Sequence, residues 1–297
     1  DLIDSKYGGP EYESWAALGS YTGVSDTKIV CKANELCARY TLDTISTGAT
    51  IAFGMECFEK GLLSLEDTGG IELKFGNGEA LLKVIDLIAK REGIGDLLAE
   101  GSARAAEKIG QGAEKLAVHC KGVELPAHIG RGQHSLALAY AILPIGADHE
   151  SSIHDGAINP TASDESMDAL GPIALHERMD PLVLDEKKVK FLYYGEMAYS
   201  MVETLSLCHF CVNCFGYGLW TYQQVRELVA AVTGWNTSLW ELLKAGERRI
   251  NLLRAFNVLA GQHQDDLPDR LFQPLEGGTA EGLKIDKEDF INARRFY

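Results

Sequence analysis

The sequence predicts a mainly α-helical protein. In most segments the apolar residues recur every three or four positions, as they do on the buried face of a helix. Several segments begin at residues that cap helices, such as Asp26, Asp43 and Asp185, and end at a glycine. Only two short stretches, 71–75 and 116–120, are expected to be strands. With 297 residues, of which 46% are hydrophobic, the chain can bury a sizeable core.

The first part of the chain is expected to alternate between helices and short connections. Pro10 suits a helix start, so the loop over 7–24 should open into a short helix. Gly61, Gly93 and Gly110 lie where glycines end helices. The expected elements, in order, are helices over 26–40, 44–60, 79–91 and 96–109, with strands over 71–75 and 116–120.

The second part is expected to contain the longer helices. A loop over 121–134 leads into a buried helix, and the polar residues 156–182, which include several prolines, are expected to form a long irregular excursion. Gly234 and Gly261 end two of the helices that follow. The expected helices are 135–143, 185–205, 222–233, 239–259 and a last one from Lys287.

Composition excludes several classes of protein. A net charge of −15 argues against a surface for nucleic acid or for an anionic membrane, because phosphates would be repelled. No apolar run reaches about 18 residues, so no membrane span is expected. The first residues do not read as a signal peptide, and seven unevenly spaced cysteines do not match a secreted disulfide framework. The sequence therefore predicts a protein located in a reducing cytoplasm.

Three cysteines, Cys208, Cys211 and Cys214, follow the long helix with the spacing C-x2-C-x2-C, and His209 lies among them. Thiolates this close can converge on one soft metal centre, because zinc and iron–sulfur clusters favour sulfur ligands. A structural zinc site usually needs a second Cys or His pair, which the sequence lacks, and a cubane cluster needs four thiolates. The alternative is that some of the three pack as small apolar residues.

Two further stretches combine acids with other reactive groups. His149 and His154 are five residues apart, with Asp148, Glu150 and Asp155 beside them. A carboxylate neighbour can tune an imidazole for proton transfer near neutral pH, although a lone histidine is more often a satisfied structural residue. Near the start, Glu11-Tyr12-Glu13 place acids and a phenol on one turn; by composition alone these are solvated helix-start acids.

The small residues over 44–50 allow the close approach of either a ligand or another helix. This segment is one of six short motifs that occur in a fixed order along most of the chain. Each motif alone is weak evidence for a family, but the six together are specific. The motifs are Glu11-Tyr12-Glu13, 42–53 (LDTISTGATIAF), 95–101 (GDLLAEG), 121–127 (KGVELPA), 138–141 (LAYA) and Leu207-Cys208. On these residues the chain resembles the tungsten-dependent aldehyde:ferredoxin oxidoreductase family.

The resemblance implies two helical domains, residues 1–125 and 126–297, with the family's N-terminal β-rich pterin-binding domain absent from this chain. The family binds tungsten through two pterins (tungsten bis-molybdopterin) beside one [4Fe–4S] cluster. The isolated chain is then an incomplete and inactive piece that carries neither group. An exposed apolar face is expected where the missing domain would dock.

The family's two D-x-x-G-L-C/D motifs fall on residues 38–43 and 203–208. In the first motif, Ala38 replaces the Asp and Thr41 replaces the Gly, so the carboxylate that would accept one pterin hydrogen bond is missing. In the second motif, Glu203 replaces the Asp and Ser206 replaces the Gly. The implied cofactor-binding residues are Leu42, Asp43, Thr44, Glu203, Leu207 and Cys208, with Cys208 as a cluster ligand.

The resemblance also assigns chemistry. Glu13 serves as a base and Tyr12 or His149 as a hydrogen-bond donor to the carbonyl oxygen, while an aldehyde is oxidised to a carboxylate. Electrons leave through the cluster to ferredoxin. The cofactor supplies the difficult chemistry and the protein orients it.

Other readings stay open. His154, Cys211 and Cys214 are more similar to the tungsten subunit of benzoyl-CoA reductases, where a cysteine ligates the metal and histidines protonate an aromatic ring. The substrate is then an aryl-CoA and the electron partner an iron–sulfur subunit. A third reading is a non-catalytic helical module that binds metal through the three cysteines and His209, and a fourth is a helical scaffold without cofactor.

Overall fold

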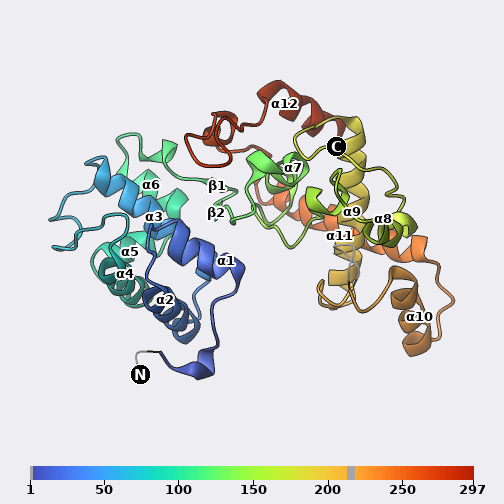
Figure 1. Cartoon of the computed structure of the whole chain (residues 1–297), viewed down its shortest axis with the longest axis horizontal. Helices are drawn as coiled ribbons and strands as arrows, with labels where there is room; N and C mark the ends of the chain where they lie inside the picture. Colours follow the sequence, from blue (N-terminus) through green and yellow to red (C-terminus); the bar gives the residue numbers. More distant parts are fainter. Residues whose placement is uncertain (1–2, 213–217) are drawn as a thin grey trace. The chain divides into compact units, whose positions relative to one another are not determined.

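The computed structural model describes residues 3–212 and 218–297, and these divide into two units. The first unit extends to Ala127 and includes Pro268–Arg270; the second contains His128–Leu267 and Leu271–Tyr297. Helices dominate both, as expected, and β1–β2 is the one sheet among the described residues (Figure 1). No described helix is long and apolar enough to cross a membrane.

The first unit is a cluster of short helices around one apolar core. Its elements are η1 (Ser5–Tyr7), α1 (Tyr12–Trp15), η2 (Ala16–Ser20), α2 (Thr27–Tyr40), α3 (Thr44–Glu59), α4 (Gly78–Lys90), α5 (Ile94–Leu98), α6 (Ser102–Ile109), η3 (Ala113–Lys115), β1 (His119–Cys120) and β2 (Val123–Glu124). The antiparallel pair β1–β2 places His119 opposite Glu124. The fully buried core includes Leu18, Ile51, Met55, Leu73, Leu81 and Ile85.

Local sequence explains where these helices begin. The Asp26 carboxylate accepts hydrogen bonds from the backbone at the start of α2, and Asp43 accepts one from Ser46 N at 2.6 Å at the start of α3. The small residues in α3 serve helix packing at Gly48, where an added Cβ would lie 2.3 Å from the Ala17 carbonyl oxygen. The sequence had left helix packing and ligand approach open at this segment.

Two expectations for the first unit are wrong. Residues 71–75 form no strand: Ile71 and Leu73 are buried alternately, but no described strand pairs with them. The helix expected over 96–109 is two helices, α5 and α6. Gly101, with φ +83°, separates them, and Ser102 N donates instead to the Glu124 carboxylate at 2.7 Å.

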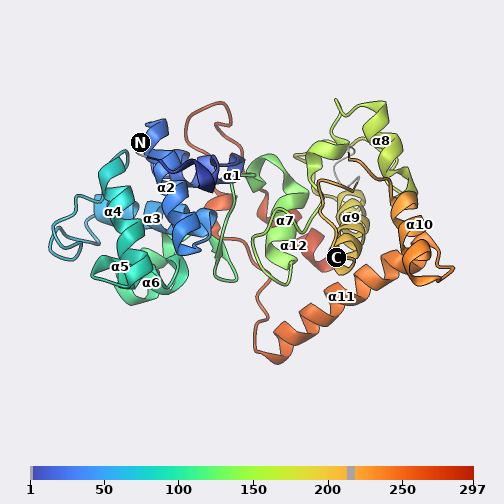
Figure 2. The same cartoon turned by 90° about the horizontal axis from the view of Figure 1, so that it is seen from below.

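The second unit is organised by two long helices, α9 and α11, which lie against each other (Figure 2). Its elements are η4 (Gly130–Gly132), α7 (His134–Ile142), η5 (Asp155–Ile158), α8 (Asp164–Leu170), η6 (Gly171–Ile173), α9 (Glu186–Thr204), α10 (Tyr222–Thr233), α11 (Leu239–Leu259) and α12 (Lys287–Phe296); η7 (Asp269–Phe272) lies at the change of unit. The irregular excursion expected over 156–182 contains α8, which Ser163 caps. The other helices agree with the expected ranges to within one or two residues.

Close helix packing and one buried ion pair hold the second unit together. A Cβ on Gly246 of α11 would lie 2.3 Å from the Met197 carbonyl oxygen of α9, so only glycine allows this approach. Lys188 of α9 is 1% exposed and donates to Asp155 Oδ1 at 2.5 Å and to the Asp180 carbonyl at 2.8 Å. The other oxygen of Asp155 accepts from Ser135 at the start of α7.

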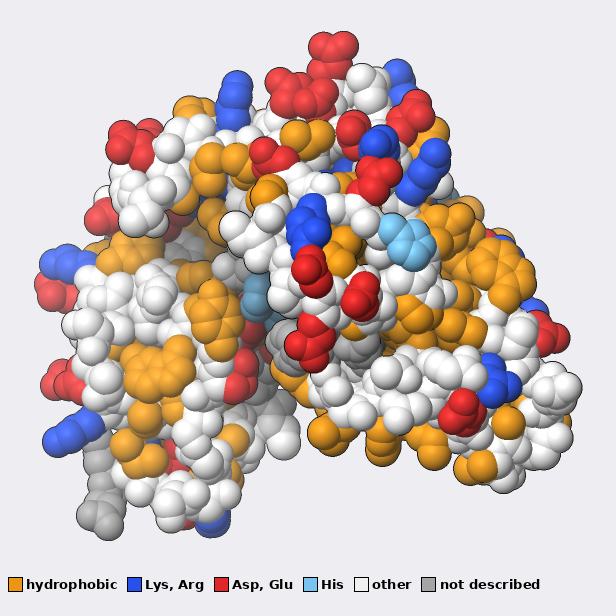
Figure 3. All heavy atoms as spheres, turned by 45° about the vertical axis from the view of Figure 1, so that its right-hand side comes forward, with side chains coloured by type: hydrophobic (Ala, Val, Ile, Leu, Met, Phe, Trp, Pro, Cys, Tyr) orange, Lys and Arg blue, Asp and Glu red, His pale blue; other side chains and the backbone are white. Residues whose placement is uncertain are grey.

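Hydrophobic side chains are exposed on several parts of the surface (Figure 3). On α11 they form a stripe at helical spacing, Leu252, Phe256 and Leu259, which are 65%, 68% and 89% exposed. The structure therefore contains an exposed apolar face on α11, and docking of a further domain on an apolar face stays a prediction.

Candidate functional site

In the first unit, the starts of α1 and α3 lie side by side. The Glu11 carboxylate caps α1, accepting from Ser14 N at 2.7 Å and from Glu13 N at 3.0 Å. Ser14 Oγ hydrogen-bonds to Thr44 Oγ1 at 2.8 Å. The adjoining starts of α1 and α3 therefore carry four of the predicted residues: Tyr12, Glu13, Asp43 and Thr44. Asp43 is exposed and Thr44 is half-buried. Leu42 packs against the apolar core beside them.

Glu13 is buried, whereas its neighbour Tyr12 is 62% exposed. Glu13 Oε2 accepts a hydrogen bond from Ala127 N at 2.7 Å, at the end of the motif over 121–127. Close by, Tyr21 donates its hydroxyl to the Leu125 carbonyl at 3.2 Å; burial, with a smaller contribution from Glu13, raises the pKa of Tyr21. Glu13 is thus a buried carboxylate held by backbone, not the solvated acid that composition alone favoured.

Glu124 supports this arrangement, and sequence reasoning assigned it no role. Its Oε1 accepts from Ser102 N at 2.7 Å, Ser102 Oγ at 2.8 Å and Thr50 Oγ1 at 3.1 Å. One buried oxygen therefore ties β2 to α3 and α6. The signal in the sequence was an acid between two apolar residues inside an otherwise recognised motif.

In the second unit, three imidazoles form a cluster. The rings of His128 and His149 are stacked with centroids 4.6 Å apart, and His154 lies 4.7 Å from His128 and 5.9 Å from His149. His154 Nε2 donates to the His149 carbonyl at 2.8 Å. The sequence singled out His149 and His154. His128 was missed because it is 21 residues before His149, beyond any local pattern.

A carboxylate, that of Glu150, lies against this histidine cluster. His149 Nε2 lies 3.1 Å from Glu150 Oε1, and this hydrogen bond holds the pKa of Glu150 below its usual value. Burial lowers the pKa of His154, partly offset by its bond to the His149 carbonyl. His154 is therefore biased toward the neutral imidazole, while Glu150 stays ionised beside His149. Such a pairing suits the holding and transfer of a proton.

Glu203, at the end of α9, connects the cluster to the cysteine segment. Its carboxylate accepts from Ser151 Oγ at 3.2 Å, is paired with Arg249, and lies 3.8 Å from His209 Nε2. The ring of His209 stacks on Tyr199 at 4.7 Å. Burial by itself raises the pKa of Glu203, but His209 and Arg249 together outweigh it, so that the pKa is lowered. An ionised carboxylate at this position thus orients the ring next to Cys208.

The cysteine segment begins where α9 ends. Cys208 is exposed and Cys211 half-buried, while the third predicted ligand, Cys214, lies outside the described residues. Leu207 packs against the core of the second unit. The structure thus brings Glu203, Leu207 and Cys208 together in one unit with His149 and His154, and Tyr12, Glu13, Asp43 and Thr44 together in the other.

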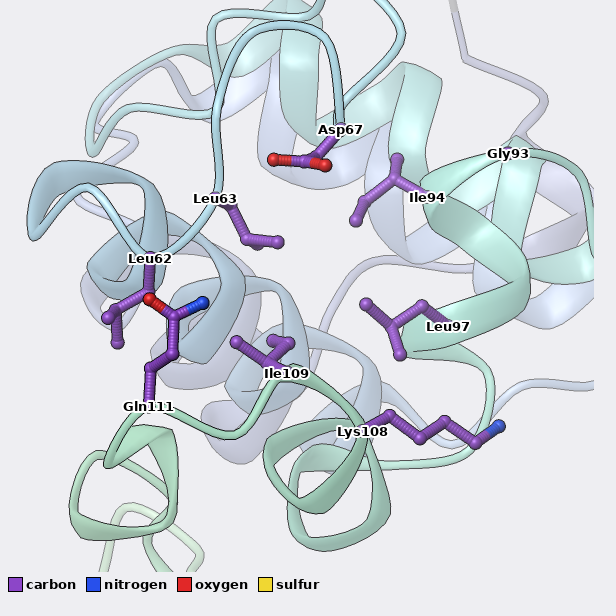
Figure 4. A pocket seen from close by; sticks show the side chains of 9 residues that line it. All are labelled: Leu62, Leu63, Asp67, Gly93, Ile94, Leu97, Lys108, Ile109 and Gln111. Carbon is purple, nitrogen blue, oxygen red and sulfur yellow. The ribbon is translucent and has the colours of Figure 1, made fainter.

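A separate pocket of about 360 Å³ lies in the first unit (Figure 4). Leu63, Ile94 and Leu97 form its apolar wall. Its acid, Asp67, already accepts from Ser64 N and Oγ, and the ammonium group of Lys108 points away from the cavity. No imidazole or thiol lines it, so its described residues offer little for catalysis.

Comparison with known proteins agrees with these motifs. The family described as "Aldehyde ferredoxin oxidoreductase, domains 2 & 3" matches residues 2–297. The chain belongs to this family. Within the aldehyde ferredoxin oxidoreductase family, it is 38% identical over 288 residues to the tungsten-containing aldehyde ferredoxin oxidoreductase of Pyrococcus furiosus, covering 95% of this chain and 44% of that protein.

A more distant aldehyde ferredoxin oxidoreductase relative is the "Aliphatic sulfonate oxidoreductase, WOR-like subunit" of Pyrococcus furiosus, 29% identical over 303 residues, with 97% of this chain and 42% of that protein covered. Among solved structures, the active site complex BamBC of benzoyl coenzyme A reductase with 1,5-dienoyl-CoA superposes with a TM-score of 0.69 at 22% identity. That match covers 96% of this chain and 46% of the other, and it shows a shared fold. The chain spans less than half the length of the curated relatives it matches.

Proposed function

We propose that this chain provides the two helical domains of a tungstopterin and iron–sulfur oxidoreductase that oxidises aldehydes to carboxylates and passes the electrons to ferredoxin. The observation that carries the proposal is the His128–His149–His154 cluster, linked by Ser151 and Glu203 to the segment that starts at Cys208. Family membership supports the same reading. We also place the protein in an anaerobic, reducing cytoplasm, which suits its exposed thiol.

The donor groups present fit the proposed cofactors. Asp43 offers an exposed carboxylate, of which one oxygen caps α3, and Glu203 offers a second acid at the matching place in the other motif. Cys208 offers an exposed thiol for a cluster. The one gap is Ala38, which cannot accept a hydrogen bond from a pterin. When bound, the tungsten centre would take up two electrons and the cluster would pass them on singly.

The protein's part is to place protons. Glu13, buried and held by Ala127 N, can accept a proton from a water nucleophile. Tyr12, whose side chain is exposed, can donate a hydrogen bond to a carbonyl oxygen. His149 lies with Nε2 against Glu150, whose carboxylate would stabilise the imidazolium that forms when His149 gains a proton. The bond from His154 Nε2 to the His149 carbonyl holds the ring of His154 against the other two imidazoles.

A second candidate is reduction of an aryl-CoA, as in the tungsten subunit of a benzoyl-CoA reductase. Three adjacent imidazoles favour it, because ring reduction needs proton donors in series, and Cys211 or Cys214 would then ligate the metal. A third candidate is a metal-binding module without catalysis. Its ligands would be Cys208, Cys211, Cys214 and His209, and zinc as the one metal found in the purified protein would support it.

The test is anaerobic expression of the longest form that the gene encodes, with tungstate supplied. Tungsten, molybdenum, iron and zinc are measured by mass spectrometry, and aldehyde-dependent and benzoyl-CoA-dependent turnover is followed with a redox dye. We expect tungsten, iron and aldehyde oxidation. Zinc without tungsten or iron would contradict the proposal, and turnover confined to the aryl-CoA would replace it with the second candidate.

Single histidine variants test the cluster. His149→Gln is expected to lower turnover by about 100-fold or more, the usual contribution of one acid–base group. His263→Gln is the matched control, because His263 is exposed and outside the cluster. Equal activity of the two variants at unchanged tungsten and iron content would remove the cluster from the mechanism.

A further inference from the structure

Cys208 and Cys211 lie at the two ends of one hydrogen-bonded turn. Cys211 N donates to the Cys208 carbonyl at 3.0 Å. A turn closed by this bond brings its first and fourth Cα atoms within about 7 Å. Disulfides join Cα atoms roughly 4.4–6.8 Å apart, so a turn of this kind is compatible with a disulfide between its first and fourth residues. Burial raises the pKa of the Cys211 thiol, and the neighbouring Cys208 thiol adds to this effect, so the two side chains lie near each other.

Backbone hydrogen bonds hold this turn at both ends. On one side, Leu207 N donates to the Val202 carbonyl at 3.1 Å, which fixes the chain to the end of α9. On the other side, Trp220 N donates to the Cys211 carbonyl at 2.9 Å, and Val212 pairs with Trp220 in a β-bridge. The turn is therefore set by its surroundings, and joining the thiols requires little movement of the main chain.

Exposure separates this pair from three other described cysteines, while Cys31 is half-buried like Cys211. Cys37, Cys57 and Cys120 are buried, and burial raises the pKa of Cys37 to about 12 and that of Cys57 to about 11. The thiols of Cys37 and Cys57 are thus held in the unreactive protonated form. Cys208 is exposed, so a reagent in solution can reach it, and Cys211 lies within the same turn.

We propose that Cys208 and Cys211 form a reversible disulfide, which makes this turn a site of thiol modification by small-molecule disulfides. The Cys208 thiolate attacks one sulfur of the reagent, forms a mixed disulfide and releases one thiol. Cys211 then attacks Cys208 Sγ and releases the second thiol. The two cysteines lose two electrons and two protons in total, and the reagent is reduced to two thiols.

The bond would have a direct consequence for cofactor loading. A sulfur in a disulfide is no thiolate, so Cys208 could not ligate a metal or cluster until the bond was reduced. The inference itself rests on the turn and not on the proposed function. The chain can form this disulfide even if it oxidises no aldehyde.

The experiment uses the purified 297-residue chain in an anaerobic glutathione buffer with a rising fraction of glutathione disulfide. Remaining thiols are blocked with N-ethylmaleimide, and peptides are mapped by mass spectrometry without reduction. We expect a peptide with Cys208 and Cys211 joined, which dithiothreitol converts back to two blockable thiols, while Cys37, Cys57 and Cys120 stay unoxidised.

Three variants make the result decisive. Cys211→Ser should abolish the internal link completely and leave Cys208 joined to glutathione, whereas Cys214→Ser and Cys31→Ser should retain it. The mapping of the wild-type chain does not depend on how a variant folds. A link from Cys208 to Cys214, or glutathione on Cys208 without any internal link in the wild-type chain, would overturn the proposal.

Discussion

Glu124 of the first unit and Asp155 of the second are both buried carboxylates, but different kinds of partner stabilise them. In the first unit, Glu124 is surrounded by neutral donors, the Ser102 amide and the hydroxyls of Ser102 and Thr50. In the second unit, Asp155 is paired with Lys188, and the partly exposed Glu150 lies beside His149. Neutral donors fix a carboxylate in place, while ionisable partners make its surroundings depend on pH. The neutral donors around Glu124 therefore do not change with pH, whereas the surroundings of Asp155 depend on the charge of Lys188.

The largest expected effect is on the buried ion pair of the second unit. Lys188→Met leaves Asp155 buried without its cation, and removing one partner of such a pair usually costs about 3–5 kcal/mol of unfolding free energy. The matched control is Lys187→Met, the neighbouring lysine, which is 66% exposed and pairs with Glu177. That change should cost less than about 1 kcal/mol. Urea unfolding measures the loss of unfolding free energy in both variants. Equal losses would show that the buried pair contributes no more than the surface pair.

A buried acid near α12 should make the stability of the second unit depend on pH. Glu196 is buried, Tyr297 donates to its Oε2 at 2.5 Å, and no described residue hydrogen-bonds to its Oε1. Burial raises the pKa of Glu196 to about 8 from the ordinary 4.5. The folded state therefore favours the protonated form, so its stability falls as pH rises from about 4.5 through about 8.

The linkage gives a loss of about 2 kcal/mol of unfolding free energy between pH 6 and pH 8 from this one group. Glu196→Gln, which is neutral at every pH and of the same shape, should abolish that part of the pH dependence. Urea unfolding of the wild-type chain and the variant at both pH values measures it. An unchanged slope in the variant would show that Glu196 is not the responsible group.

The smallest effect is expected in the first unit. Glu124→Gln keeps a carbonyl oxygen where Oε1 accepts its three hydrogen bonds, so the loss of unfolding free energy should stay near 1 kcal/mol. Glu124→Ala, which leaves the buried Ser102 amide unpaired, should cost about 1–3 kcal/mol. If Glu124→Gln lost as much unfolding free energy as Glu124→Ala, the charge of Glu124 would matter more than its hydrogen bonds. The contrast between Glu124 and Asp155 would then weaken.

Local chemistry made much of the fold predictable. Asp26, Asp43 and Asp185 cap the helices that follow them, because a side-chain oxygen satisfies amides two or three residues away. The apolar periodicity behind each cap then predicted α2, α3 and α9. The ordered motifs also predicted the family, since they depend on residue type and order alone.

Contacts between distant residues decided the rest. The helix expected over 96–109 is interrupted because Glu124, 22 residues beyond Ser102, binds the Ser102 amide. The segment 71–75 alternates like a strand but has no strand to pair with among the described residues.

The candidate site shows the same division. The sequence identified His149, His154 and Cys208 by type and spacing, and Glu203 by its place in a motif of the family that the chain resembles. Only the tertiary structure added His128 to the imidazole cluster and paired Arg249, 46 residues away in the chain, with Glu203. The physical reason is that caps and periodicity act within a few residues, whereas burial and charge pairing depend on which distant segments the folded chain brings together.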